Sequence, residues 1–192
     1  PVIEGNKELE DAYTHGFYSG DGYFLNREKQ HMIDMCGIKK KLLKYLKYRR
    51  VYVHPNGNIR ITLYDNGYDK SFVPDCKFTI KSRLEWLAGI IDSDGCVSSK
   101  GITLSSINKD FLLKIKYMLN TLGVNTTISI MKKACSKLMP DGKGGLKEYN
   151  CATSYNLQIA SSDITKLKEL GLKTYRVSII GSNNKVTKRF IK

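Results

Sequence analysis

Three stretches in the second part of the chain repeat apolar residues at the spacing of an amphipathic helix. The clearest covers residues 108–122, with Asn108 as a typical N-cap, Gly123 as a typical stop, and an apolar stripe of Phe111, Leu112, Ile115, Leu119 and Leu122. The other two cover residues 82–93 and 162–170, and Gly171 follows the latter. We predict three helices here.

Shorter stretches alternate apolar and polar residues, as strands with one buried face do. In the second part of the chain they cover residues 97–98, 102–105, 126–134 and 153–160. A segment rich in glycine and lysine, residues 136–147, separates the last two strands. We predict a loop for that segment.

The first part of the chain repeats this order at smaller size. We predict a helix over residues 8–20, strands over 22–25 and 32–36, and a helix over 38–48 whose apolar stripe is Leu42, Leu43 and Leu46. A hairpin then joins residues 51–53 to 59–64, with Asn56-Gly57 as a typical two-residue turn. The doubled order indicates an internal repeat, and we predict an α+β fold of two related halves, residues 1–78 and 79–192.

The 192-residue chain holds 32 Lys and Arg against 18 Asp and Glu, a formal net charge of +14. Residues 79–192 carry +11 of it and residues 1–78 only +3. Such a balance favours a polyanionic partner, most simply nucleic acid, over the alternative of a merely soluble basic surface.

Several protein classes are excluded by composition. No apolar run approaches the ~20 residues that a membrane span needs, and the first residues lack a signal-peptide pattern. The five cysteines are widely spaced without a C-x-x-C pair, and three histidines add no recognisable zinc ligand set. We expect an intracellular protein with reduced thiols, with no membrane partner.

The first predicted helix of each half ends in an Asp-Gly pair, Asp21-Gly22 and Asp94-Gly95. Aligned on these pairs, both helices place small residues four apart: Gly16 with Gly20, and Gly89 with Ser93. Small residues on one face let two helices approach closely, which would bring two carboxylates together at negative helix ends. A hard divalent cation would relieve that repulsion. The alternative is a pair of exposed turn residues.

These residues resemble the LAGLIDADG family, which is named for the motif. Residues 87–95 match it at seven of nine positions, whereas residues 14–22 keep only Gly16, Asp21 and Gly22. Between them, residues 70–74 resemble the Lys-x-apolar-Pro block of intein-encoded homing endonucleases. The resemblance implies a site-specific, double-motif, monomeric endonuclease of double-stranded DNA. It also implies two pseudo-twofold-related αββαββα halves with saddle-shaped antiparallel sheets.

The resemblance also implies an active site at the two motif ends. The metal-binding residues would be Asp21 and Asp94, with the backbone carbonyls of Gly20 and Ser93, holding Mg²⁺ or Mn²⁺. A basic residue near the scissile phosphate would be Lys70 in one half and Lys173 in the other. For both lysines the alternative is a solvated surface position. Asp92, matched only by Ser19, is interpreted as a helix-end residue.

Strand alternation predicts which side chains face DNA. Ile59, Ile61 and Leu63 would face the core, which leaves the intervening residues on the other face. Residues after the motifs should begin the DNA-facing strands, unless the face is simply solvated. The predicted DNA-binding residues are Arg27, Lys29, Arg60, Thr62, Tyr64, Ser98, Lys100, Thr103, Ser105, Lys133, Asn156 and Gln158.

Two alternatives remain on the same fold, a DNA-binding regulator that does not cut and an RNA-splicing maturase. Protein splicing by the chain itself is not expected, because the printed ends, Pro1 and residues 190–192, carry neither an N-terminal nucleophile nor a His-Asn pair. We expect a monomer that needs no protein partner, and that is either free-standing or embedded in or excised from an intein.

Overall fold

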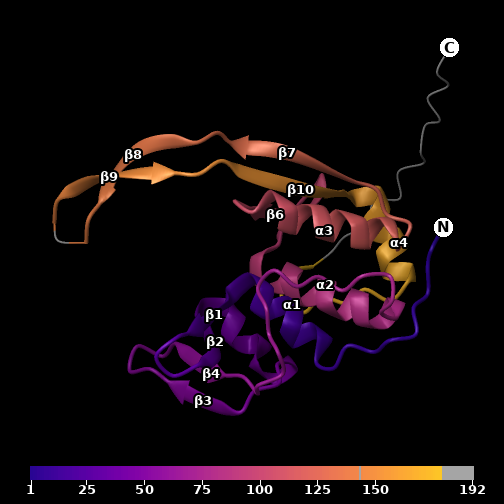
Figure 1. Ribbon diagram of the computed structural model, residues 1–192, viewed down its shortest axis with the longest axis horizontal. Coiled ribbons are helices and arrows are strands. Elements are labelled where there is room, and N and C mark those ends of the chain that lie inside the picture. Colours follow the sequence, from indigo (N-terminus) through magenta and orange to yellow (C-terminus); the bar gives the residue numbers. More distant parts are fainter. Residues whose placement is uncertain (143, 179–192) are drawn as a thin grey trace.

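The computed structural model describes residues 1–142 and 144–178 (Figure 1). The first elements are α1 (Ala12–Asp21), β1 (Gly22–Leu25), β2 (Gln30–Met35), a 3₁₀ helix η1 (Gly37–Tyr45), β3 (Arg50–Val53) and β4 (Ile59–Thr62). They are followed by α2 (Ile80–Asp94), β5 (Cys96–Ser98), β6 (Gly101–Ser106), α3 (Lys109–Asn120), β7 (Thr126–Lys132), β8 (Cys135–Pro140), β9 (Leu146–Cys151), β10 (Ser154–Ala160) and α4 (Ser161–Glu169).

Two four-stranded antiparallel sheets have the same internal order. The first runs β1-β2-β4-β3 and the second β5-β6-β10-β7, so each sheet places its last strand between its second and third. Each sheet has its own apolar core, around Phe17, Ile33 and Ile61 in the first and around Ile91, Ile102 and Leu157 in the second. The predicted α+β fold, built on open sheets, is confirmed.

Helices α1 and α2 pack against each other between the two sheets (Figure 1). A Cβ on Gly16 would lie 1.8 Å from the backbone oxygen of Trp86, and one on Gly89 would lie 2.1 Å from that of Tyr13. A Cβ on Gly20 would lie 2.1 Å from Ser93 Oγ. The two backbones therefore touch along the small faces that the motifs supply, and no larger residue fits there.

The helix predicted over residues 38–48 is instead the shorter 3₁₀ helix η1. In an α-helix, Lys40 and Lys44 would be like charges four residues apart, with Lys39 and Lys41 beside them, which disfavours that helix. Lys39 and Lys40 are instead drawn to separate acceptors, the Asp21 carboxylate and the Gly57 carbonyl. Leu42 and Leu46 are buried as predicted.

The loop predicted over residues 136–147 is wrong. Strands β8 and β9 form a two-stranded hairpin there, which projects beyond the second sheet (Figure 1). Between the two strands, Gly142 and Gly144 adopt positive φ angles. These two glycines therefore belong to the connection between the strands, whereas Lys137 and Lys147 lie on the strands themselves.

The β3–β4 turn is also longer than predicted. It spans residues 54–58, because the His54 amide donates to the Asn58 carbonyl at 2.8 Å. Gly57 has a φ of 78°, so the glycine still supplies the conformation that the turn requires. Among the described residues, no helix has the length and apolar character needed to cross a membrane.

The close approach of α1 and α2 gives a stability prediction. Gly16→Ala forces a methyl group onto the Trp86 carbonyl, and we expect the free energy of unfolding to fall by ~1–3 kcal/mol or more. Urea denaturation measures this, with Lys168→Ala on exposed α4 as the control. Equal stability of Gly16→Ala and the wild type would contradict the packing described here.

A second prediction concerns His15, which is buried in α1 with its ring stacked on Tyr68 at a centroid distance of 4.2 Å. Burial lowers the pKa of His15 from 6.5 to about 4. The unfolded chain therefore binds more protons than the folded one in this window, and stability falls as the pH drops from 6.5 towards 4.

His15→Phe keeps a ring in the stack but cannot titrate, so its stability should depend less steeply on pH in that window. Urea denaturation across the window measures the slope, and the range above about pH 8, where the imidazole is neutral in both states, is the internal control. Identical slopes for variant and wild type would show that His15 does not carry the effect.

Candidate functional site

The ends of α1 and α2 bring Asp21 and Asp94 together. Gly22 and Gly95 follow these helices in extended conformation, so α1 continues directly into β1 and α2 into β5. Gly20 leaves room for the neighbouring helix, since a Cβ there would lie 3.1 Å from Asp94 Oδ2. The two carboxylates therefore sit on either side of the helix contact, as the motif alignment predicts.

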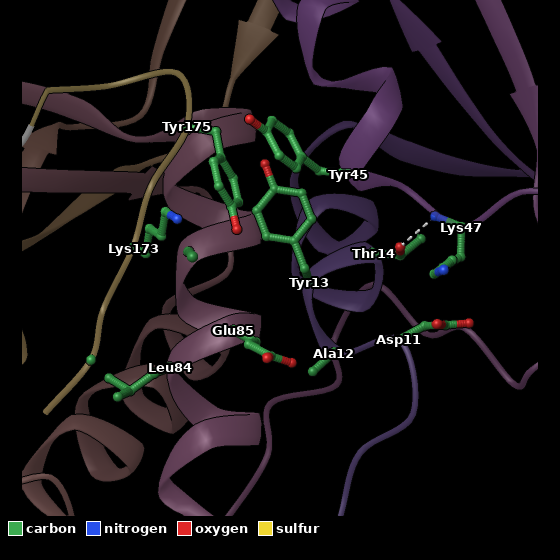
Figure 2. Close-up of a pocket in the computed structure, with 12 residues that line it drawn as sticks. Asp11, Ala12, Tyr13, Thr14, Tyr45, Lys47, Leu84, Glu85, Lys173 and Tyr175 are labelled. Carbon is green, nitrogen blue, oxygen red and sulfur yellow. Dashed lines mark hydrogen bonds between the residues drawn. The ribbon is translucent and has the colours of Figure 1, made fainter.

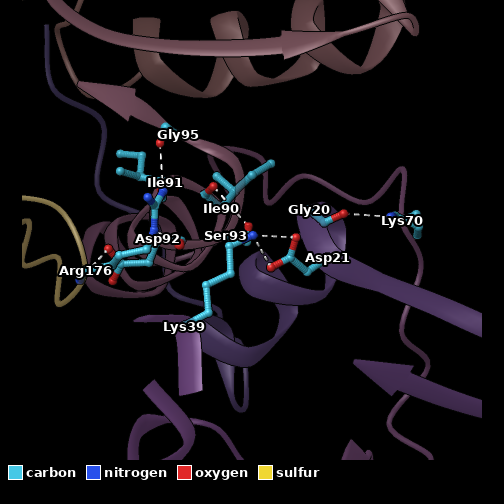
Figure 3. Close-up of polar contacts among 10 residues, drawn as sticks. All are labelled: Gly20, Asp21, Lys39, Lys70, Ile90, Ile91, Asp92, Ser93, Gly95 and Arg176. Carbon is cyan, nitrogen blue, oxygen red and sulfur yellow. Dashed lines mark hydrogen bonds and ion pairs between the residues drawn. The ribbon is translucent and has the colours of Figure 1, made fainter. Parts of the chain in front are cut away.

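Lys39 holds the Asp21 carboxylate. Its Nζ donates to both oxygens of Asp21, at 2.8 and 2.6 Å (Figure 3). Burial nevertheless raises the pKa of Asp21 above its ordinary value. The Lys39 ammonium opposes that rise, while the Asp94 charge adds to it. Sequence analysis missed Lys39, which is one of several lysines in η1 and carries no motif.

Lys70 also reaches the site. Its Nζ donates to the backbone oxygen of Gly20 at 2.8 Å, so the Lys-x-apolar-Pro segment delivers a cation to the end of α1 (Figure 3). Lys70, Gly20 and Asp94 line a pocket of about 260 Å³ that reaches Ser105 on the second sheet. The carbonyl of Gly20, predicted as a metal ligand, is therefore already bonded to an ammonium group.

The end of α2 is held differently. Asp92 is fully buried, and its carboxylate accepts hydrogen bonds from the backbone amides of Tyr175 at 2.7 Å and Arg176 at 2.9 Å. It also accepts the Tyr13 hydroxyl at 2.9 Å. Asp92 is therefore committed to structural bonds and is not available to a cation. Its interpretation as a helix-end residue agrees with this geometry.

The donor set limits how a metal ion could bind. Within residues 1–142 and 144–178 there is no cluster of three or more His, Cys, Asp or Glu side chains. Asp21 and Asp94 supply hard carboxylate oxygens of the kind that Mg²⁺ and Mn²⁺ prefer. The Ser93 side chain is buried, and its hydroxyl donates to the Ile90 carbonyl at 3.1 Å. Two carboxylates fit a divalent ion that takes its remaining ligands from backbone, water or a bound polyanion.

Lys173 does not join these residues. It lines a separate pocket of about 410 Å³ beside the N-terminal part of the helix pair, with Tyr13, Tyr45 and Tyr175 (Figure 2). Its Nζ lies 5.7 Å from the centroid of the Tyr175 ring. No hydrogen bond or ion pair links Lys173 to either aspartate in the described part of the chain. Its position after a helix stop did not specify which face it would occupy.

The polar face of the second sheet is ordered by cross-strand pairs. Thr103 donates to Gln158 at 2.7 Å, and Ser105 donates to Asn156 at 2.7 Å. The alternate residues Ile102, Leu104, Leu157 and Ile159 are buried. Alternation therefore predicted this face correctly.

Arg60 in the first sheet is paired with a residue that sequence analysis missed. Its Nε and Nη2 donate to Asp34 at 2.7 and 3.0 Å, and this bidentate contact lowers the pKa of Asp34. Asp34 lies directly opposite Arg60 in the β2–β4 register. Thr62 lies half-buried in β4, and Tyr64 is exposed beyond its end.

Five predicted DNA-binding residues lie at turns or strand ends. The prediction that Arg27, Lys29 and Lys100 begin DNA-facing strands is wrong, because β1 and β5 start at the ends of the motifs and stop before these residues. Arg27 and Lys29 lie in the β1–β2 turn, Lys100 in the β5–β6 turn, Ser98 at the end of β5, and Lys133 in the break between β7 and β8.

Comparison with known proteins finds relatives that are much longer than this chain. It is 37% identical over 185 residues to the large subunit of ribonucleoside-diphosphate reductase from Invertebrate iridescent virus 6, covering 92% of this chain and 19% of that protein. It is 33% identical over 110 residues to ribonucleoside-diphosphate reductase NrdEB subunit alpha from Bacillus subtilis (strain 168), covering 53% of this chain and 10% of that protein. The chain thus spans a fifth or less of these relatives.

Solved structures of the homing endonuclease I-DmoI share the fold. A structure of its mesophilic variants has a TM-score of 0.54 at 17% identity, covering 87% of this chain and 97% of that one. I-DmoI in complex with DNA and Ca has a TM-score of 0.56 at 16% identity, covering 88% of this chain and 92% of that one.

The family profile for the LAGLIDADG-like domain matches residues 81–189, which is more than half of the chain. The match contains the second motif and the whole second sheet. Together with the two helices joined at their small faces, it shows that the chain belongs to the LAGLIDADG family.

Proposed function

We propose that this chain is a divalent-metal-dependent homing endonuclease that cuts both strands of a long, asymmetric DNA site. The observation that carries the proposal is the meeting of Asp21 and Asp94 at the ends of the packed helices. One carboxylate per half suits a duplex with two scissile phosphates. Structures of I-DmoI with target DNA and Mn, and with DNA and Ca, support the choice of partner and cofactor.

The chemistry would divide between the carboxylates and the lysines. A divalent ion held by Asp21 and Asp94 would supply Lewis-acid activation of water at the phosphate. Lys39 and Lys70 place two positive charges beside the Asp21 end, where they would stabilise negative charge developing on phosphoryl oxygens. Lys39 would have to move from Asp21 towards the phosphate as the ion binds.

The two sheets would bind DNA with their polar faces. Residues 1–78 and 79–192 would each contact one half-site as parts of a monomer, and their unequal size suits a site without twofold symmetry. Thr103, Ser105, Asn156 and Gln158 would contact base edges and phosphates. Arg60 would keep its bond to Asp34 or exchange it for a base, since its guanidinium is partly exposed.

The relatives suggest where such an endonuclease resides. A chain with an endonuclease fold that matches 19% of a ribonucleotide reductase subunit is not expected to reduce ribonucleotides. We infer that it is the endonuclease part of an intein inserted in a subunit of this kind. The Lys70–Pro74 block, similar to that of intein-encoded endonucleases, supports this inference.

The test of the proposal is neutralisation of either carboxylate. Asp21→Asn and Asp94→Asn should abolish double-strand cleavage and leave DNA affinity unchanged or raised, since a negative charge near phosphate is lost. Cleavage of a randomised DNA library with Mg²⁺, followed by gel-shift titration on a selected site, measures both quantities.

Glu169→Gln on the exposed side of α4 is the control, because it removes a carboxylate at a distance from the helix ends and from the polar faces of both sheets. Full cleavage by either site variant, or cleavage by the wild type in chelator, would contradict the metal assignment. Binding to RNA without any DNA cleavage would favour the maturase alternative.

The β8–β9 hairpin gives a salt-dependence prediction. Lys137 and Lys147 point to one face of it, together with Cys135 and Cys151, because residues two apart on a strand share a face. Lys132 lies close enough to Lys137 to lower its pKa, so a third lysine adjoins this face of the hairpin. Replacing Lys137 and Lys147 by Ala should weaken binding to all duplexes and flatten the salt slope by up to ~2 units.

Lys116→Ala with Lys168→Ala is the control, since α3 and α4 cover the opposite, apolar face of the second sheet. Fluorescence anisotropy on target and scrambled duplexes across a salt series measures both double variants. Equal slopes for the hairpin variant and the wild type would remove the hairpin from the interface. Lys143, the third lysine of this segment, lies outside the described residues.

A further inference from the structure

The segment of residues 172–177 crosses from the end of α4 to the end of α2. Leu172 packs in the core of the second half, and the Asp92 carboxylate then receives the amides of Tyr175 and Arg176. A buried carboxylate that accepts several N–H groups fixes the backbone that supplies them. The segment is therefore attached two residues before Asp94.

Arg176 binds the last turn of α2 on both sides of Asp94. Its Nη2 donates to the carbonyls of Ile91 at 2.9 Å and Gly95 at 2.7 Å, and its Nε donates to the carbonyl of Asp92 (Figure 3). The last carbonyls of a helix lack intrahelical partners and form the negative end of the dipole. The Asp92 carbonyl is one of these, whereas the Ile91 carbonyl also accepts the Gly95 amide and the Gly95 carbonyl lies just beyond the helix. One guanidinium thus binds three carbonyls around the end of α2 and opposes the negative charge that would disfavour a carboxylate there.

The end of α1 is stabilised in another way. There Lys70 binds the Gly20 carbonyl, and Lys39 binds the Asp21 carboxylate itself. Within the described residues, no cation forms an ion pair with Asp94. At the end of α2 the positive guanidinium of Arg176 binds backbone carbonyls and not the Asp94 side chain. The Asp94 side chain is therefore open to the pocket that it lines.

The same segment also contacts the first half. The ring of Tyr175 stacks on Tyr45 of η1, with centroids 3.7 Å apart and an angle of 13° between the planes (Figure 2). Tyr13 of α1 lies edge-on to Tyr175 at 5.4 Å and donates its hydroxyl to Asp92. Residues 172–177 therefore join both halves at the level of the helix pair.

We infer that Arg176 is a positioning residue for the half of the active site that contains Asp94. It fixes the backbone of residues 91–95 so that the Asp94 carboxylate points into the pocket with its charge uncompensated. This inference rests on the proposed function for its effect on cleavage, but its effect on the end of α2 is independent of cleavage.

The inference predicts an asymmetric defect. Arg176→Met loses the guanidinium donors at the end of α2, keeps the backbone amides that bind Asp92, and leaves the end of α1 unchanged. The two DNA strands should therefore be affected unequally. A displacement of a catalytic group by about 1 Å can cost ~100-fold in rate. We expect the ratio of the two single-turnover strand-cleavage rate constants to change at least about tenfold, with nicked DNA accumulating.

Two further variants separate positioning from general destabilisation. Arg83→Met removes another buried arginine of α2, which binds the Ile3 carbonyl and Thr121 near the other end of the helix, and it should leave the strand ratio as in the wild type. Arg176→Lys keeps the charge without the planar fork and should remain as asymmetric as Arg176→Met. An unchanged ratio in Arg176→Met, or a ratio restored by Arg176→Lys, would overturn the inference.

Hydrogen exchange measured by mass spectrometry on the free full chain gives a readout without cleavage. Arg176→Met should speed exchange in the peptide that contains residues 91–96 by about fivefold or more, because an uncapped last turn opens more often. The peptide with residues 18–23 should not change, and Arg83→Met should not reproduce the pattern. If the wild type cuts no DNA, the proposed function fails, while unchanged exchange at residues 91–96 overturns the role of Arg176.

Discussion

The direct backbone contact between α1 and α2 is the constraint on which the rest of the structure depends. Gly16 and Gly89 leave no volume for side chains at the contact, so the helices meet at van der Waals distance of main-chain atoms. Each helix then runs without a loop into the first strand of a sheet. The distance between the two sheets and the separation of Asp21 from Asp94 both follow from this one contact.

That contact carries an electrostatic cost, because it gathers two carboxylates at two negative helix ends. The two halves offset the cost differently. In the first half Lys39 neutralises the Asp21 side chain directly, whereas in the second half Arg176 neutralises the helix carbonyls around Asp94. The site is thus symmetric in its helices and asymmetric in its charges.

The two sheets differ in a related way. The polar face of the second sheet is held by neutral pairs such as Thr103 with Gln158, and the β8–β9 hairpin extends beyond it with exposed lysines. The first sheet carries the ionic pair of Arg60 and Asp34. Most lysines of the second half that the structure describes are exposed, where they would attract phosphate without distinguishing bases.

The sequence by itself determined the doubled element order, the buried faces of the strands and the N-cap at Asn108, because these depend on local periodicity and on local hydrogen bonding. It also determined the pairing of the two aspartates, because small residues four apart before each Asp-Gly pair allow the two helices to pack closely with their ends together. Only the tertiary structure decided which cations serve the site. Lys39, Lys70, Lys173 and Arg176 are long side chains in a basic chain, and the fold alone determines which acceptor each can reach. The hairpin at residues 135–151 was decided in the same way, since glycine and lysine content does not distinguish an open loop from two strands joined by a tight turn.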